Sequence, residues 1–332
     1  MSTICSCLPP GTGINPGPLF TNEKILYRIQ TVKKMNLKDK LIIFIGSSSV
    51  LSGIDENIVR NIFNIKKIDK IPLNFGLLGM SAIELPFHKD CFLNKNVHLV
   101  VYLYNTFSFP RYLSISPEQA NEIKAIRWNT FEFFRALYKN DLMFYVVPYR
   151  WYIISGIECE LFKAIKFNNV LRYFIFNFLS TKKHDFIHDW HTANRIEPYI
   201  AQRPRIFEKI EQNDGLRQLY IESETDEATF GYNQLERFLY LAKEKGKKVV
   251  VAPFPEPEFA LWNRRKGIKI NKIDCHVQRI VESYNMIFLE RNIFDNIEKN
   301  DSYYIDVVHM GKTGSEIYSK YLAKIIINYI NS

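Results

Sequence analysis

The sequence predicts an α/β protein in which a parallel β-sheet is covered by helices on both faces. Short strand-like runs recur along the chain with helical segments between them, an alternation that is typical of parallel sheets. Several of these runs are continuously apolar, such as "HLVVYLY" and "KKVVVAPF", as strands buried on both faces should be. The last segment, "GKTGSEIYSKYLAKIIINYI", has apolar residues at helical spacing and predicts a helix packed on the sheet.

The elements follow one another in a regular order, with one interruption. A lead segment, 1–38, opens with a stretch rich in Pro and Gly. From about 107–232 the strand-helix rhythm stops, and aromatic-rich amphipathic stretches such as "WNTFEFFRALY" appear. We expect this interval to be a largely helical insertion near the active edge of the sheet, inside one domain that spans 39–332. Five strands are predicted, at 41–45, 71–75, 97–103, 247–252 and 286–289.

The composition is that of a globular protein able to bury a large core. Of the 332 residues, 47% are hydrophobic and 24% are charged, so disorder is not expected. The net charge of +9 would suit an anionic partner, but the basic residues are scattered in pairs and no nucleic-acid motif accompanies them. We therefore expect no nucleic acid among the partners. The five cysteines are odd in number and widely spaced, which predicts reduced thiols.

The sequence shows no targeting or membrane-spanning segment. The first residues have neither a basic region nor a long apolar region, and no stretch reaches the roughly 18 apolar residues of a spanning helix. We expect a cytoplasmic protein on this ground, with the cell envelope as the alternative if the true N-terminus lies upstream. The short apolar stretch "LRYFIFNFLS" leaves peripheral membrane contact open. Nothing in the sequence indicates an oligomeric state.

Polar or glycine-containing segments follow three of the predicted strands, and a fourth precedes the last helix. The run "GSSS", residues 46–49, follows the first strand, and "NFGLLGMSA", residues 74–82, begins within the second. Asn105 comes directly after the third strand, and "DVVH", residues 306–309, stands before the final helix. Because open α/β sheets carry their chemistry outside the carboxyl ends of the strands, we expect these segments to lie together.

Acyl transfer by a serine needs such a set of groups. A hydroxyl is a weak nucleophile at its free pKa, so an imidazole must take its proton and a carboxylate must orient that imidazole. The oxyanion that forms needs fixed donors, which backbone N–H groups and an Asn amide can supply. A glycine at that place lets the substrate approach the backbone closely.

In this order the segments resemble the SGNH (GDSL-type) hydrolase superfamily, over about 41–109 and 247–330. That family has a catalytic Ser in a Gly-Asp-Ser turn, an oxyanion Gly and Asn after the next two strands, and an Asp-x-x-His pair before the last helix. The resemblance implies a three-layer flavodoxin-like fold. It also implies catalysis by Ser48, His309 and Asp306, with an oxyanion hole formed by Gly79, Asn105 and the Ser48 N–H.

Two positions depart from the family pattern. Ser47 stands where the family has Asp, and Leu103-Tyr104-Asn105-Thr106 replaces the usual Gly-x-Asn-Asp block. The "GSS" turn resembles a divergent bacterial branch of the superfamily found in envelope biology, which includes polysaccharide O-acetyltransferases. We expect Ser47 and Ser49 to cap N–H groups of the following helix.

The expected function is serine-dependent hydrolysis of an acyl ester or acylated glycan, without a metal or organic cofactor. An O-acyltransferase acting on a cell-envelope polysaccharide is the first alternative, and a non-catalytic binding protein with the same fold is the second. His184, His188 and His191 could form a metal site, but we expect them to be solvated or stacked side chains of the insertion.

Overall fold

The computed structural model describes residues 39–76, 80–105, 108–109, 229–257, 270–305 and 308–330. The chain divides into two compact units, and all the described residues belong to the one formed by Met35–Ser114 and His191–Ser332. The lead segment, 1–38, lies outside the described residues. So does the insertion of about 107–232, apart from 108–109 and its last four residues, and both remain predictions.

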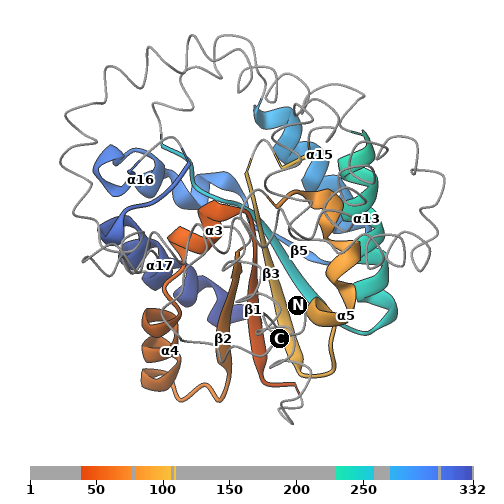
Figure 1. Cartoon of the computed structure of the whole chain (residues 1–332), viewed down its shortest axis with the longest axis horizontal. Coiled ribbons are helices and arrows are strands. Elements are labelled where there is room, and N and C mark those ends of the chain that lie inside the picture. The colour runs from red at the N-terminus through yellow and green to blue at the C-terminus, as the bar shows by residue number, and fades with distance from the viewer. Residues whose placement is uncertain are drawn as a thin grey trace, which may run out of the picture. The chain divides into compact units, whose positions relative to one another are not determined.

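Five parallel strands form a single sheet in the order β2-β1-β3-β4-β5 (Figure 1). Every strand begins and ends within one residue of the range predicted from the sequence. This confirms the predicted parallel α/β fold, and the strand order is that of the flavodoxin-like doubly wound sheet. The strands are β1 (Leu41–Gly46), β2 (Ile71–Gly76), β3 (Val97–Tyr104), β4 (Lys248–Pro253) and β5 (Ile287–Phe288).

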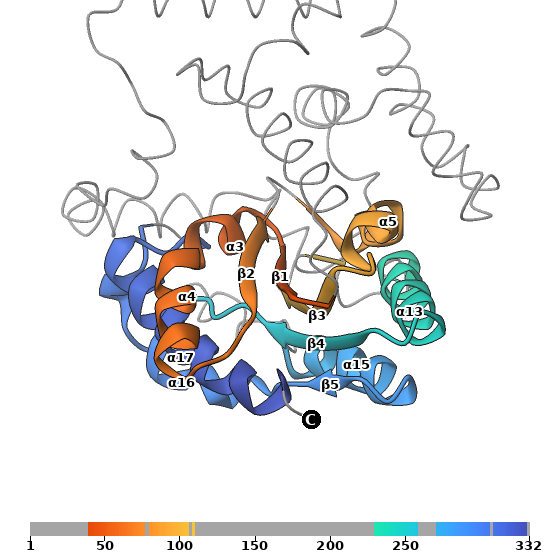
Figure 2. The same ribbon diagram turned by 90° about the horizontal axis from the view of Figure 1, so that it is seen from below.

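Helices cover both faces of the sheet, which gives the predicted three layers (Figure 2). On one face α4 and α17 pack against each other, and on the other face α13 packs against α15. The predicted final helix is confirmed as α17. The helices are α3 (Ser48–Gly53), α4 (Glu56–Ile65), α5 (Lys89–Phe92), α13 (Thr229–Glu244), α15 (Ile270–Ser283), α16 (Asp295–Glu298) and α17 (Lys312–Ile330). Short 3-10 turns are η1 (Ala82–Glu84), η2 (Pro86–His88), η6 (Arg291–Phe294) and η7 (Asp301–Tyr303).

Local sequence explains how α4 begins and which side it buries. The Asp55 carboxylate accepts hydrogen bonds from the N–H groups of Asn57 and Ile58, so two of the donors at the start of the helix are satisfied. Val59 and Phe63, one turn apart, are completely buried in the core. Side chains four residues apart lie on one side of a helix, so this spacing directs α4 onto the sheet.

The strand order reverses at β1, because the chain adds β2 on one side of it and β3 on the other. β1 pairs with β2 on one side and with β3 on the other, and Gly46 is the last paired residue of β1. A Cβ atom at Gly46 would overlap the carbonyl oxygen of Leu103 on β3 and lie 2.5 Å from the Val50 side chain. Only glycine therefore allows β1 and β3 to stay in contact up to the residues that leave the sheet.

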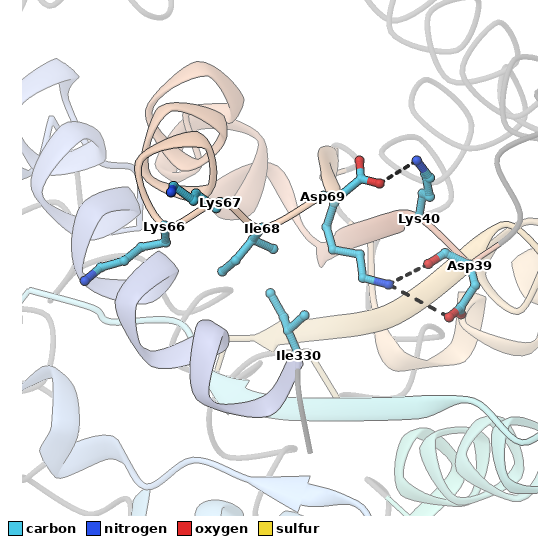
Figure 3. Close-up of a pocket in the computed structure, with 8 residues that line it drawn as sticks. Asp39, Lys40, Lys66, Lys67, Ile68, Asp69 and Ile330 are labelled. Carbon is cyan, nitrogen blue, oxygen red and sulfur yellow. Dashed lines mark hydrogen bonds and ion pairs between the residues drawn. The ribbon is translucent and has the colours of Figure 1, made fainter.

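A shallow pocket of about 410 Å³ lies at the other end of the strands, where β1 and β2 begin (Figure 3). Two ion pairs cross it: the Lys40 Nζ lies 2.6 Å from the Asp69 carboxylate, and the Lys70 Nζ lies 3.9 Å from that of Asp39. Lysines at the carboxyl end of α4 also offset the negative end of its dipole. The basic character of this pocket therefore has a structural explanation. It is lined by Asp39, Lys40, Lys66, Lys67, Ile68, Asp69, Lys70 and Ile330.

Substituting Gly46→Ala should lower the free energy of unfolding by about 2 to 3 kcal/mol, since the new methyl group must push β1 away from β3. Gly246→Ala is the matched control. Gly246 has φ of 60° and an open surrounding, so only backbone strain of about 1 kcal/mol is expected there. Urea denaturation followed by circular dichroism measures both losses. Equal losses would show that the contact at Gly46 is not tight.

Candidate active site

Ser48 and His309 meet at the carboxyl edge of the sheet. The Ser48 Oγ and the His309 Nε2 are 2.8 Å apart, which is hydrogen-bond distance. Ser48 is the first residue of α3, two residues after the end of β1, and His309 lies just before α17. Both side chains are half-buried. The sequence predicted that these two residues would come together, although 261 positions separate them.

The start of α3 presents Ser48 to the site. Ser47 is the N-cap residue, and its Oγ accepts a hydrogen bond from the Ser49 N–H at 3.3 Å. The Ser47 carbonyl accepts from the N–H groups of Val50 and Leu51 at 3.0 and 3.2 Å. The neighbouring donors are thus used within the turn. In the described part of the chain, no acceptor contacts the N–H of Ser48, which therefore suits the role of a donor to a ligand.

The other end of α3 is held by a buried asparagine on β2. The Asn74 Nδ2 donates to the carbonyl oxygens of Val50 and Ile54 at 3.0 and 2.9 Å. The Asn74 Oδ1 accepts from the Gly76 N–H at 2.8 Å. Asn74 therefore satisfies carbonyl groups at the end of the helix that carries Ser48. No local sequence pattern marks Asn74 for this role, because the carbonyls that it reaches lie on another element.

His309 is fixed by a narrow loop. Its carbonyl oxygen accepts a hydrogen bond from the Ile305 N–H at 2.9 Å, and Tyr304 and Met310 form an isolated antiparallel bridge. The Tyr303 carbonyl packs so closely on the first turn of α17 that a Cβ at Gly314 would overlap it. These contacts fix the backbone on both sides of His309. Asp306, the predicted partner of the imidazole, lies outside the described residues, and its role remains a prediction.

Asn105 reaches the same edge from β3 and is completely buried. Its Oδ1 accepts a hydrogen bond from the Ser47 hydroxyl at 2.6 Å, and its Nδ2 donates to the Ser49 Oγ at 3.1 Å. Its backbone N–H donates to the Ser108 hydroxyl at 2.8 Å. The expected cap is confirmed for Ser47 but wrong for Ser49, because the Ser49 side chain turns to the amide of Asn105. Gly79, the predicted oxyanion glycine, lies outside the described residues.

A largely buried ion cluster connects chain segments at the ends of β3, β4 and β5. The Arg291 guanidinium donates to both carboxylate oxygens of Asp274 at 2.7 and 3.2 Å and to Glu298 at 2.9 Å. The Tyr104 hydroxyl, at the end of β3, donates to Asp274 at 2.6 Å. The backbone N–H of Glu256, after β4, donates to Glu298 at 3.1 Å. One cluster thus links the segments after three neighbouring strands.

The charges in this cluster are fixed by their partners. Burial alone would lower the pKa of Arg291, but the carboxylates of Asp274 and Glu298 raise it above its ordinary value. Burial, and then the charge of Asp274, hold the pKa of Tyr104 well above the usual value, so the phenol stays a donor. Breaking a buried pair of this kind leaves an uncompensated charge. The cluster therefore stabilises the end of β3 at Tyr104, the residue before Asn105.

The described residues contain no group of three or more His, Cys, Asp or Glu side chains that could hold a metal ion. His184, His188 and His191 lie outside them, so the expectation that these histidines are solvated or stacked stays a prediction. Among the helices that the structure describes, none is long and apolar enough to cross a membrane.

Comparisons with known proteins give only weak structural similarity. No family model and no curated protein matches the sequence. A protein provisionally named platelet activating factor, from Streptococcus pneumoniae, matches at 12% identity and a TM-score of 0.43, over 93% of this chain and 92% of its own. A provisionally named acylhydrolase from Bacteroides fragilis gives 12% and 0.42, over 92% and 95%. A GDSL-like lipase from Bacteroides thetaiotaomicron gives 12% and 0.40, over 93% and 98%. Similarity at this level carries no argument about activity.

Substituting Asn74→Ala should lower the free energy of unfolding by about 2 to 3 kcal/mol, because it leaves buried carbonyls of α3 and the Gly76 N–H without their partner. Asn61→Ala is the matched control, since Asn61 is exposed on α4, and it should change stability by less than about 0.5 kcal/mol. Chemical denaturation of the two variants beside the wild type gives both numbers. If Asn74→Ala proves as mild as Asn61→Ala, the asparagine does not hold α3.

Proposed function

We propose that the protein is a serine-dependent acyl-ester hydrolase in which Ser48 is the nucleophile and His309 is the general base. The observation that carries the proposal is the 2.8 Å contact between the Ser48 Oγ and the His309 Nε2. Hydroxyl-to-imidazole contact at this distance is the geometry that proton removal from a serine requires. The place of the pair supports the proposal, since it lies at the carboxyl edge of the sheet, beside the reversal point between β1 and β3.

In the proposed reaction, His309 takes the hydroxyl proton while the Ser48 Oγ attacks the ester carbonyl carbon. The carbonyl oxygen becomes an oxyanion, which the N–H of Ser48 and the Asn105 amide, together with the backbone N–H of Gly79, would stabilise. Asp306 would orient the imidazole. When the tetrahedral intermediate collapses, the ester C–O bond breaks and the imidazolium gives its proton to the leaving alcohol. Water then attacks the acyl-enzyme, releasing the acid and restoring Ser48.

A fluorophosphonate probe tests the nucleophile directly. Attack by the Ser48 Oγ forms a bond to phosphorus and expels fluoride, so intact-protein mass spectrometry should show one adduct, which peptide mapping places on Ser48. Ser48→Ala should abolish the adduct and lower kcat/KM for p-nitrophenyl acetate by about a thousandfold or more. His309→Ala should lower kcat/KM by a similar factor.

His98→Ala is the matched control, because the His98 ring binds Asp39 and the Ile330 carbonyl at the opposite end of the strands. This variant should keep nearly the full rate. A folded wild-type protein that takes up no probe and hydrolyses no ester would overturn the proposal in favour of a binding protein with this fold. Equal losses in His98→Ala and His309→Ala would point to general destabilisation instead of catalysis.

Hydrolysis and acyl transfer to a sugar hydroxyl share the same first half-reaction and differ only in the acceptor. We expect acetate release from an acetyl ester to proceed at the same rate with and without an added polysaccharide, because water can attack the acyl-enzyme. Acetate measurement and mass spectrometry of the glycan follow the two products together. Negligible acetate release until polysaccharide is added, with acetylated sugar as the product, would replace hydrolysis by O-acyl transfer.

A further inference from the structure

We infer that Ser47 and Ser49 are positioning residues that fix the orientation of the Asn105 amide, and through it one donor of the oxyanion hole; this inference rests on the proposed function. Neither serine is used in the reaction described above, yet both lie beside the nucleophile in the sequence. Ser47 is 3% exposed, and Ser49 and Asn105 are completely buried. Buried polar groups are normally held in hydrogen bonds with defined directions.

The distances decide which way the amide points. The Asn105 Oδ1 lies 2.6 Å from the Ser47 Oγ, a length typical of a hydroxyl that donates to an oxygen. The Nδ2 lies 3.1 Å from the Ser49 Oγ, a length typical of an amide N–H that donates to an oxygen. With the amide turned by 180°, an N–H would face Ser47 at a distance too short for that type of bond. The observed orientation is therefore the favoured one.

The side chains of Ser47, Ser49 and Asn105 form a closed ring of hydrogen bonds. Ser47 has one hydroxyl proton, and the short contact to Asn105 uses it. The Ser49 Oγ accepts from the amide of Asn105, which leaves the Ser49 proton for the 3.3 Å contact between the two hydroxyl oxygens. Each member then donates once and accepts once around the ring. Chains of hydrogen bonds polarise one another, so the ring resists rotation of the amide more than two separate bonds would.

The ring determines which N–H of Asn105 can serve the reaction. Because the two serine oxygens lie only 3.3 Å apart, the N–H that bonds to Ser49 is the one on the same side of the amide as Oδ1. The second N–H points away from both serines and is the donor available to an oxyanion. Without Ser47, the amide can rotate and present its oxygen, which would repel the developing negative charge instead of stabilising it.

A double-mutant cycle on hydrolysis of p-nitrophenyl acetate tests this positioning role. Ser47→Ala should lower kcat by about ten- to a hundredfold, less than complete loss of an oxyanion donor, and should change KM by less than about threefold. In an Asn105→Ala background, the same substitution should cause almost no further loss of kcat, because the group that Ser47 orients is gone. Ser52→Ala is the matched control, since among the described residues the buried Ser52 hydroxyl bonds only to the Ser49 carbonyl within α3.

Side-chain NMR gives a second readout that does not depend on activity. In protein labelled with ¹⁵N-asparagine, the two amide protons of Asn105 are assigned by their disappearance in Asn105→Ala. Ser47→Ala should shift this pair of signals and speed its exchange with water, whereas Ser52→Ala should leave it in place. The measurement reports the orientation of the amide whether or not the protein hydrolyses the ester.

The outcomes separate the two proposals. Loss of kcat in Ser47→Ala that disappears in the Asn105→Ala background, with shifted amide signals, supports the inference. Losses that multiply independently in the double variant, or amide signals that Ser47→Ala does not move, overturn it while the proposed hydrolase stands. A wild-type protein without ester hydrolysis or probe labelling overturns the proposed function and the catalytic part of this inference, and the amide signals then show whether the ring itself exists.

Discussion

The contact between the ends of β1 and β3 is the constraint on which the candidate site depends. Gly46 is paired with Leu103, and the missing side chain lets the two backbones stay together up to the last residue before they diverge. From there, one step along β1 reaches Ser47, and two steps along β3 reach Asn105. Parallel strands make this alignment automatic, since their carboxyl ends share one edge. A wider separation of the strands would break the hydrogen bonds between the serine turn and Asn105.

The helix that carries Ser48 is held by its surroundings and not by its own helix propensity. With six residues, α3 is too short to be stable alone, because the first turn of a helix is costly to form. Ser47 caps its beginning, and Asn74 binds the carbonyl oxygens near its end. Both side chains are buried, so the bonds are shielded from competition with water. The position of Ser48 therefore follows from tertiary contacts at both ends of a single short helix.

The sequence predicted the frame of the protein well, because apolar runs and their spacing are local signals. Those runs located all five strands of the described sheet, and the order of the polar segments brought Ser48 and His309 together. Contacts between distant elements left no such signal. Ser49 could be read as a helix cap from its neighbours, yet its hydroxyl meets an asparagine 56 positions away. The link from Tyr104 to Asp274 spans 170 positions, and no local pattern marks it.

The distance along the chain between Ser48 and His309 has a consequence for synthesis. A ribosome that builds the chain from its amino end produces the serine turn early and the histidine 261 residues later. Until β5 has joined the sheet and α17 has packed on α4, the Ser48 hydroxyl cannot form its contact with His309. In the proposed hydrolase, a nascent or prematurely terminated chain would therefore not attack esters in its surroundings. The contact between Ser48 and His309 exists only in the completed fold, so the proposed activity would begin only after folding is complete.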